Sequence, residues 1–290
     1  MYRFGVRLLA ASAWCVLLLA AGWFPVRAAT RAQAQPTVYM ALGDSVAAGA
    51  GASALEYRYT ERLQQFFRGP RTGAITTAVN FARSGETSAS FIQGTQGQPG
   101  APQLQAALDQ INNPANDVNI VTLTLGGNDL LQLLAPGQPC ADPESPGCPP
   151  AVQQALTTFA GNYASIMQQL MQALANDPGA ELVLVMTYYN PASGTGSPYE
   201  PLVDAALLGS DGRVDCTAAG AARGLNDLIA CTNAAVGART VDVYPLFQGK
   251  GLQLTQVSQG SVHPNDAGHG VIAGAFITAA GYIFLPVVSR

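Results

Sequence analysis

Five short apolar runs, rich in β-branched residues and separated by segments with helical spacing, constrain the fold of this chain most strongly. They span residues 37–42, 75–81, 118–125, 182–187 and 240–243. Continuous apolar runs of this length are typical of strands buried on both faces, as in a parallel sheet covered by helices on each side. We therefore predict a three-layer α/β/α sandwich, in which ligands bind beyond the carboxyl ends of the strands.

Two helices can be placed with their start signals. Apolar residues recur every three or four positions after Pro149 and Pro150, which predicts a long helix whose apolar stripe belongs to the core. A second helix is expected to follow Asn265, a plausible N-cap, and to run toward Gly281. The uncharged segment 271–288 is interrupted by Gly281 and Pro286, so we interpret it as a buried terminal helix and tail rather than a membrane span.

The first 34 residues have the pattern of an export signal. Arg3 and Arg7 precede an uncharged stretch, and Ala32-Gln33-Ala34 supplies a small-x-small cleavage site. We expect residues 1–34 to be a signal peptide, residues 35–290 to be the mature domain, and the protein to be secreted to the extracellular space. The uncharged stretch is long enough to cross a bilayer, so an uncleaved N-terminal anchor is the alternative.

Four cysteines follow the signal: Cys140, Cys148, Cys216 and Cys231. In an oxidising compartment an even number of cysteines predicts disulfides, and four of them permit three pairings. Proximity in the sequence favours Cys140–Cys148 and Cys216–Cys231. A metal site is not expected, because no C-x-x-C occurs and both histidines lie far along the chain.

Charge and glycine patterns exclude several classes of ligand. The chain carries 18 Asp and Glu against 14 Lys and Arg, and its single lysine, Lys250, leaves no basic stripe for nucleic acid. Gly251 follows that lysine where a P-loop needs Ser or Thr. The segment 49–54 matches G-x-G-x-x-G/A, but it begins too far beyond the strand that ends near Leu42 to bind a dinucleotide. No cofactor is expected.

Polar and glycine-rich motifs follow three of the predicted strands in turn. Ser45 comes directly after the first strand, where a nucleophile can meet a substrate and helix N-terminal amides. The G-x-S-x-G elbow of the usual α/β-hydrolases is absent, because Ala47 stands where its second glycine would be. Gly85 follows the second strand, and Asn128 follows the third as a neutral donor suited to a transient oxyanion.

The two histidines of the chain lie near the start of the last predicted helix. His263 precedes Pro264 and is therefore expected in an extended loop, whereas His269 lies one turn inside the helix, where it packs or caps. Each of these signals alone fits a turn or a helix cap about as well as a site. Their occurrence in order at successive strand ends favours a site.

The segments GDSVAAG, ARSGETS, LGGND and VHPNDAGH resemble, in order, the four blocks of the SGNH (GDSL-type) hydrolases, most closely their bacterial secreted esterase and lipase branch. The resemblance implies a flavodoxin-like sheet of five parallel strands. It also implies that Ser45 is the nucleophile and His263 the general base, and that the Ser45 N–H, Gly85 and Asn128 form an oxyanion hole. The resemblance implies no metal or organic cofactor.

One position departs from the family pattern. The family commonly has an aspartate three residues before the histidine, where this chain has Gly260. Either a backbone carbonyl near Gly260 accepts the imidazole Nδ1–H, or Asp242 or Asp266 reaches the ring, or the enzyme is impaired. We favour a Ser–His dyad supported by a carbonyl, since a carbonyl preserves the histidine tautomer and its lack of charge costs only about tenfold in rate.

The sequence thus predicts a monomeric secreted serine esterase or lipase that hydrolyses carboxylic esters through an acyl-enzyme on Ser45. Its substrate is expected to be a small-molecule or lipid ester, with no nucleic acid and no stable membrane insertion after signal cleavage. An acetyl-carbohydrate esterase and a lipase both remain open. The alternative from another class is a non-catalytic carbohydrate- or lipid-binding protein on a degenerate hydrolase scaffold, which Gly260 prompts.

Overall fold

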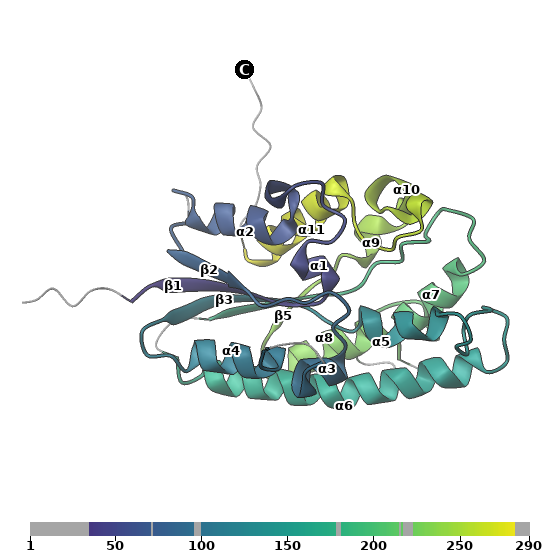
Figure 1. Ribbon diagram of the computed structural model, residues 1–290, viewed down its shortest axis with the longest axis horizontal. Helices are drawn as coiled ribbons and strands as arrows, with labels where there is room; N and C mark the ends of the chain where they lie inside the picture. Colours follow the sequence, from purple (N-terminus) through teal and green to yellow (C-terminus); the bar gives the residue numbers. More distant parts are fainter. Residues whose placement is uncertain are drawn as a thin grey trace, which may run out of the picture. The chain divides into compact units, whose positions relative to one another are not determined.

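A parallel sheet of five strands forms the middle layer of the computed structural model (Figure 1). The structure describes residues 35–70, 72–95, 100–177, 181–214, 216 and 223–281; the expected signal peptide, residues 1–34, lies outside them. The strands are β1 (Thr37–Gly43), β2 (Thr77–Asn80), β3 (Asp117–Thr124), β4 (Leu182–Met186) and β5 (Arg239–Val241). Their spatial order is β2-β1-β3-β4-β5, with every pair parallel. The predicted flavodoxin-like α/β sandwich is therefore confirmed.

Helices cover both faces of the sheet (Figure 1). One face carries α1 (Ser45–Ala48), α2 (Tyr59–Arg68), α9 (Tyr244–Phe247), α10 (Gly251–Leu254) and α11 (Asp266–Ala279). The other carries α3 (Ser88–Gln93), α4 (Gln103–Ile111), α5 (Gly127–Leu131), α6 (Cys148–Leu174), α7 (Glu200–Leu208) and α8 (Leu225–Val236). Three short 3₁₀ turns complete the described elements: η1 (Leu55–Tyr57), η2 (Gln132–Leu134) and η3 (Val257–Gln259).

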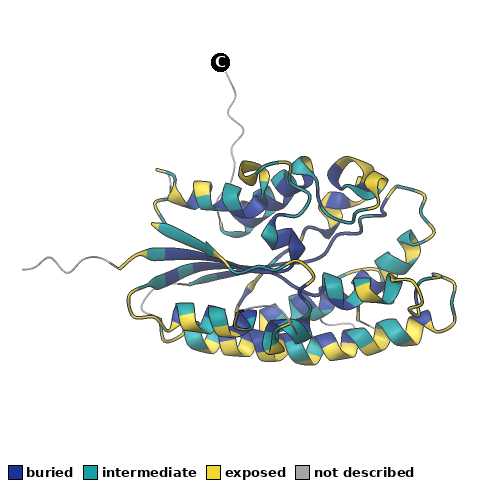
Figure 2. Cartoon of the chain, viewed as in Figure 1, coloured by how far each residue is buried: buried dark blue, intermediate teal, exposed yellow. Residues whose placement is uncertain are grey.

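The two faces of the sheet pack into separate hydrophobic cores. Along β1, Val38 and Met40 belong to the core under α4 and α6, whereas Tyr39 and Ala41 belong to the core under α2 and α11. Successive strand residues point to opposite faces, so a strand buried on both faces needs apolar residues at every position. The central strands β1, β3 and β4 are mostly buried, whereas the edge strand β2 is half-buried to exposed and is drawn in teal and yellow in Figure 2. Exposed residues gather on the outer sides of the helices.

Both predicted helices are present. The long helix is α6, which has prolines in its first turn and buries Leu156, Phe159, Tyr163 and Ile166 among other residues of its stripe. The terminal helix is α11, where the side chain of Asn265 caps the first turn by accepting from Gly268 N at 3.0 Å. In the part of the chain that the structure describes, no helix combines the length and the apolar character that a bilayer crossing requires.

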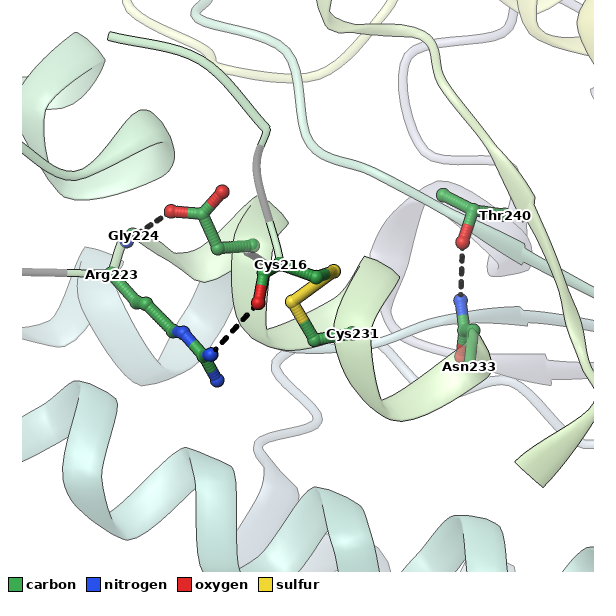
Figure 3. The surroundings of a disulfide bond; sticks show 7 residues. Cys216, Arg223, Gly224, Cys231, Asn233 and Thr240 are labelled. Carbon is green, nitrogen blue, oxygen red and sulfur yellow. Dashed lines mark hydrogen bonds between the residues drawn. A yellow bond between two sulfur atoms is a disulfide. The ribbon is translucent and has the colours of Figure 1, made fainter. Parts of the chain in front are cut away.

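The structure pairs the same cysteines that lie close in the sequence, Cys140 with Cys148 and Cys216 with Cys231. The first disulfide joins the segment after η2 to the first residue of α6. The second joins α8 to the segment that precedes it, and Arg223 donates a hydrogen bond to the carbonyl oxygen of Cys216 at 3.2 Å beside it (Figure 3). Each disulfide therefore ties a connection to a long helix.

Candidate active site

Ser45 lies at the carboxyl end of β1, where the chain turns sharply into α1. Gly43 has φ +125°, and a Cβ there would lie 2.0 Å from Thr124 O of the neighbouring strand, so only glycine fits this turn. Asp44 then caps α1 by accepting from Val46 N at 3.0 Å. The turn places Ser45 as the first residue of α1, where its own backbone N–H faces outward from the helix start.

The structure brings Ser45 and His263 together. Ser45 Oγ lies 2.9 Å from His263 Nε2, although the two residues are 218 positions apart in the chain. Both line a cavity of about 400 Å³, as does Asn128. A hydroxyl within hydrogen-bond distance of an imidazole nitrogen at the mouth of a cavity is the arrangement that activates a serine for nucleophilic attack.

The other nitrogen of the ring has a partner that the sequence argument missed. His263 Nδ1 lies 2.9 Å from Ser261 Oγ, which also accepts a longer bond of 3.4 Å from the backbone N–H of His263. The prediction that a backbone carbonyl is the partner of Nδ1 is therefore wrong, because the side-chain hydroxyl of Ser261 lies in that position. Asp242 and Asp266 do not supply the partner either: they bond to Thr187 and Ser53, respectively.

These contacts allow the tautomer of His263 that catalysis requires. A hydroxyl oxygen has two acceptor lone pairs, so Ser261 Oγ can accept from the backbone N–H of His263 and from a proton on Nδ1 at the same time. With the ring proton on Nδ1, the Nε2 atom is free to accept from Ser45. This is the tautomer that a general base needs.

The loop that carries His263 is held against the segment after α1. A Cβ at Gly51 would lie 2.2 Å from Pro264 O and 3.0 Å from His263 Cβ, so this glycine lets the two segments approach closely. Gln256 Nε2 donates to Gly51 O at 3.1 Å, and Ser53 bonds to Asp266. The G-x-G-x-x-A pattern at residues 49–54 therefore has a structural role: it is the surface on which the histidine loop rests.

Gly85 lies in the turn after β2 and Asn128 in the first turn of α5, and a hydrogen bond joins these two segments. Asn128 Nδ2 donates to Glu86 O at 2.9 Å, which uses one of its two N–H bonds and leaves the other for a ligand. Gly85 has φ +81° and is exposed, and its N–H makes no hydrogen bond to another described residue. The backbone N–H of Gly85 is therefore available to an anion beside Asn128.

Two buried hydrogen-bond networks that support Gly85 and Asn128 had no signal in the sequence. Asp129 accepts from Ser88 N at 2.9 Å and from Ser88 Oγ, which fixes α5, and with it Asn128, against α3. Gln103 bonds to both Gly43 N and Gly43 O, and its Nε2 also reaches Glu86 Oε2 at 2.8 Å. Such links between loops depend on tertiary approach, which a motif in one segment does not reveal.

Asp44 is buried beneath the nucleophile. Its carboxylate accepts from Val46 N, from Thr124 Oγ1 at 2.8 Å and from the hydroxyl of Tyr188. Burial raises the pKa of Asp44 to about 6, although the bonds from Tyr188 and Thr124 oppose the shift. None of these three bonds involves His263, so this carboxylate supports the turn that presents Ser45 and does not orient the ring.

Burial also affects both histidines. Desolvation lowers the pKa of His263 below its ordinary value, so the ring is neutral at neutral pH and able to accept a proton. His269 is fully buried, its Nε2 lies 3.0 Å from Ala50 O, and its pKa is likewise lowered by burial. His269 thus packs inside the fold, as its helical position predicts, and lies apart from Ser45.

Comparisons with known proteins identify the family of this chain. Residues 41–271 match the profile of the GDSL-like lipase/acylhydrolase family. A spore germination lipase, LipC, from Bacillus licheniformis is 24% identical over 247 residues, which are 84% of this chain and 96% of that protein.

Two solved structures have the same fold. A lipase from a goat rumen metagenome gives a TM-score of 0.56 at 19% identity, covering 84% of this chain and 97% of the other. An acetylxylan esterase from Geobacillus stearothermophilus gives 0.53 at 15% identity, covering 87% and 97%. The family match, which spans most of the chain, confirms the resemblance carried by the four sequence blocks. The protein belongs to the GDSL-like lipase/acylhydrolase family and is a carboxylic ester hydrolase.

Proposed function

We propose that this protein is a secreted serine esterase that acts through an acyl-enzyme on Ser45, with His263 as the general base. The single observation that carries the proposal is the 2.9 Å contact between Ser45 Oγ and His263 Nε2 at the edge of the cavity. His263 Nε2 accepts the Ser45 proton as Oγ attacks the ester carbonyl carbon, and then returns it to the leaving alcohol. A water molecule then attacks the carbonyl carbon of the acyl-enzyme while His263 accepts its proton. His263 returns this proton to Ser45 Oγ as the acid leaves, which restores Ser45.

Ser261 has the role that an aspartate commonly has in this family. Its hydroxyl accepts the Nδ1–H of His263 and so holds the ring with Nε2 toward Ser45. In serine proteases, replacing the triad aspartate by asparagine costs about 10⁴ in rate, a loss attributed to the wrong tautomer. A hydroxyl acceptor avoids that loss and lacks only the charge, which is worth about a factor of ten. A Ser–His dyad oriented by Ser261 is therefore compatible with turnover.

Three donors are suited to the oxyanion that develops on the ester carbonyl. They are the backbone N–H groups of Ser45 and Gly85 and the second N–H of the Asn128 side chain, the first being bonded to Glu86 O. We expect Asn128→Ala to lower kcat by roughly 10²–10³, as the loss of one oxyanion donor does elsewhere. Steady-state kinetics with a nitrophenyl ester measure this, and a kcat equal to that of the wild type would remove Asn128 from the site.

Secretion is supported by the pattern of residues 1–34 and by the two disulfides. Disulfides persist in oxidising compartments outside the cytoplasm, and both cysteine pairs of the structure are closed. They would also stabilise the enzyme after export: the Cys216–Cys231 bond closes a separation of 15 positions, and a closed loop of about 15 residues contributes roughly 3 kcal/mol in the chain-entropy account.

The assignment of the nucleophile is tested by Ser45→Ala. We expect this variant to lose hydrolysis of a short-chain nitrophenyl ester, because no hydroxyl remains to form the acyl-enzyme. The matched control is Ser165→Ala on the exposed side of α6, which should retain wild-type turnover. Undiminished hydrolysis by purified Ser45→Ala would refute the proposal.

A further inference from the structure

We propose that the cavity beside Ser45 binds the acyl chain of the substrate, and that the preferred substrates are esters of medium-chain fatty acids rather than acetylated sugars. The inference rests on the proposed function, since it assigns one side of the ester to the space next to the nucleophile. It is carried by the lining of the cavity, which combines an apolar wall with tyrosine hydroxyls that are already bonded inside the protein.

The wall of the cavity comes mainly from two apolar segments. Leu130 and Leu131 of α5 and Leu133 and Leu134 of η2 form one part, and α7 contributes Leu207 with its neighbours. Apolar walls stabilise an occupant in proportion to the apolar surface that it removes from water. An alkyl chain gains from such a wall, whereas a sugar ring does not.

The polar side chains of the lining offer little to a sugar. Three tyrosines face the cavity, but their hydroxyls donate to partners within the protein: Tyr188 to Asp44, Tyr189 to Val262 O, and Tyr199 to Ala141 O. Their rings are therefore what an occupant meets. The hydroxyls of a buried sugar would lose their water partners without replacement, which costs about 1–3 kcal/mol for each unsatisfied group by mutational data.

The position of the cavity relative to the dyad assigns it to the acyl side. Asn128 begins the run of lining residues that continues through α5 and η2, so the cavity extends from the oxyanion side of Ser45. His263, which must protonate the leaving alcohol, also lines the cavity but is only partly buried, so its ring is reached from solvent. The alcohol thus leaves toward solvent while the acyl chain stays in the cavity.

The size of the cavity limits the chain length. A dry cavity of about 150 Å³ holds benzene, with six carbons. The volume of about 400 Å³ found here therefore corresponds to about sixteen carbons as an upper limit. Part of that space holds the ester group and the open mouth, which places the best fit at chains of about six to twelve carbons.

A series of nitrophenyl esters tests the assignment on the purified mature protein. With each ester kept below its aggregation concentration, kcat/KM should rise from acetate by up to about fourfold per methylene, reach a maximum between hexanoate and dodecanoate, and then fall. A maximum at acetate would overturn the acyl-site assignment. A parallel series of acetates with lengthening alcohols should stay nearly flat, and a rise there instead of in the acyl series would place the alcohol in the cavity.

A variant that fills the cavity provides the second test. Ala206 of α7 lines the cavity and is 7% exposed, whereas the adjacent Ala205 is exposed on the outer side of the same helix. We expect Ala206→Phe to lower the octanoate-to-acetate ratio of kcat/KM at least tenfold and Ala205→Phe to leave this ratio unchanged. An unchanged ratio in a folded Ala206→Phe variant would contradict the proposal.

A third measurement needs no variant, should Ala206→Phe fail to fold. Wild-type enzyme should be inactivated faster by an octyl fluorophosphonate than by its ethyl analogue, and equal rates would overturn the acyl-site proposal.

The Ser45→Ala variant distinguishes failure of the acyl-site proposal from failure of the proposed function. If the proposed function is wrong, Ser45→Ala will still hydrolyse every ester. If Ser45→Ala loses acetate hydrolysis and the wild type gains nothing from longer acyl chains, the acyl-site proposal is wrong and the proposed function stands.

Discussion

At the scale of single residues, the hydroxyl of Ser261 stands where a carboxylate is common in this family, and this difference has consequences for pH dependence. His263 must be neutral to accept the Ser45 proton. Burial lowers the pKa of His263, and the neutral Ser261 does not offset this by stabilising the imidazolium with a charge. Activity is therefore expected to persist to a lower pH than an ordinary histidine pKa of about 6.5 would allow.

The pH profile of kcat/KM tests this interpretation with a set of variants at one position. Wild-type activity should fall on the acid side with an apparent pKa below 6.5. Ser261→Asp should move that limb to higher pH, because a carboxylate beside the ring, in place of the hydroxyl that now contacts Nδ1, favours the charged ring. An acid limb that does not move in Ser261→Asp would show that position 261 does not contact the ring.

Two further variants at position 261 test whether Ser261 orients the ring of His263 or only packs against it. Ser261→Ala removes the acceptor of the Nδ1–H bond and should lower kcat by about fivefold with little change in KM, because one neutral hydrogen bond contributes about 1 kcal/mol. Ser261→Thr retains the hydroxyl and should recover most of the loss. Equal kcat values for Ser261→Ala and wild type would eliminate the positioning role.

At the scale of elements, the segment after α1 and the loop before α11 must fit against each other for the dyad to form. Gly51→Ala should lower kcat strongly, because its Cβ would lie 2.2 Å from Pro264 O and force the His263 loop away from Ser45. The matched control is Gly237→Ala, which has nearly the same φ, +83° against +87°, but open space around its Cβ. Only the Gly51 variant should lose turnover, as nitrophenyl ester kinetics on both folded proteins would show; equal losses would point to backbone strain alone.

The disulfides allow a similar comparison between elements. Cys140 lines the cavity, whereas neither Cys216 nor Cys231 does. Removing Cys140–Cys148 by a double alanine substitution should lower both Tm and the octanoate-to-acetate ratio, because the cavity wall after η2 loses its tie to α6. Removing Cys216–Cys231 should lower Tm and leave the ratio intact. If both removals change the ratio equally, the Cys140–Cys148 disulfide has no particular role in shaping the acyl cavity.

At the scale of the whole molecule, the sequence predicts the sheet and the residues that meet at the site. It does not predict the contacts that hold these residues in place. The strands are recognisable because both faces of β1 need apolar residues, and parallel strands bring Ser45, Gly85 and Asn128 to one edge. Ser261 was missed because its role depends on how the loop folds back under the ring. Gly51 and Gln103 were missed because a close approach or a link between loops exists only in three dimensions.

The proposed export also concerns the whole molecule, and the residues on which it depends, 1–34, lie outside the described part of the chain. If residues 1–34 are a cleaved signal, the protein recovered from the culture medium of an expressing bacterium should have an intact mass that begins near residue 35, with both disulfides closed. Retention of the full-length chain in the membrane fraction would instead support an uncleaved anchor.

The central claim, that Ser45 and His263 act as one nucleophilic pair, is tested most directly by covalent trapping. Incubation with a fluorophosphonate, followed by intact-mass measurement and peptide mapping, should give one adduct per chain, located on Ser45. His263→Ala should label far more slowly, because Ser45 loses the base that lies 2.9 Å from its hydroxyl. An inert Ser45 in folded wild-type protein, an adduct on another residue, or wild-type labelling of His263→Ala would contradict the account.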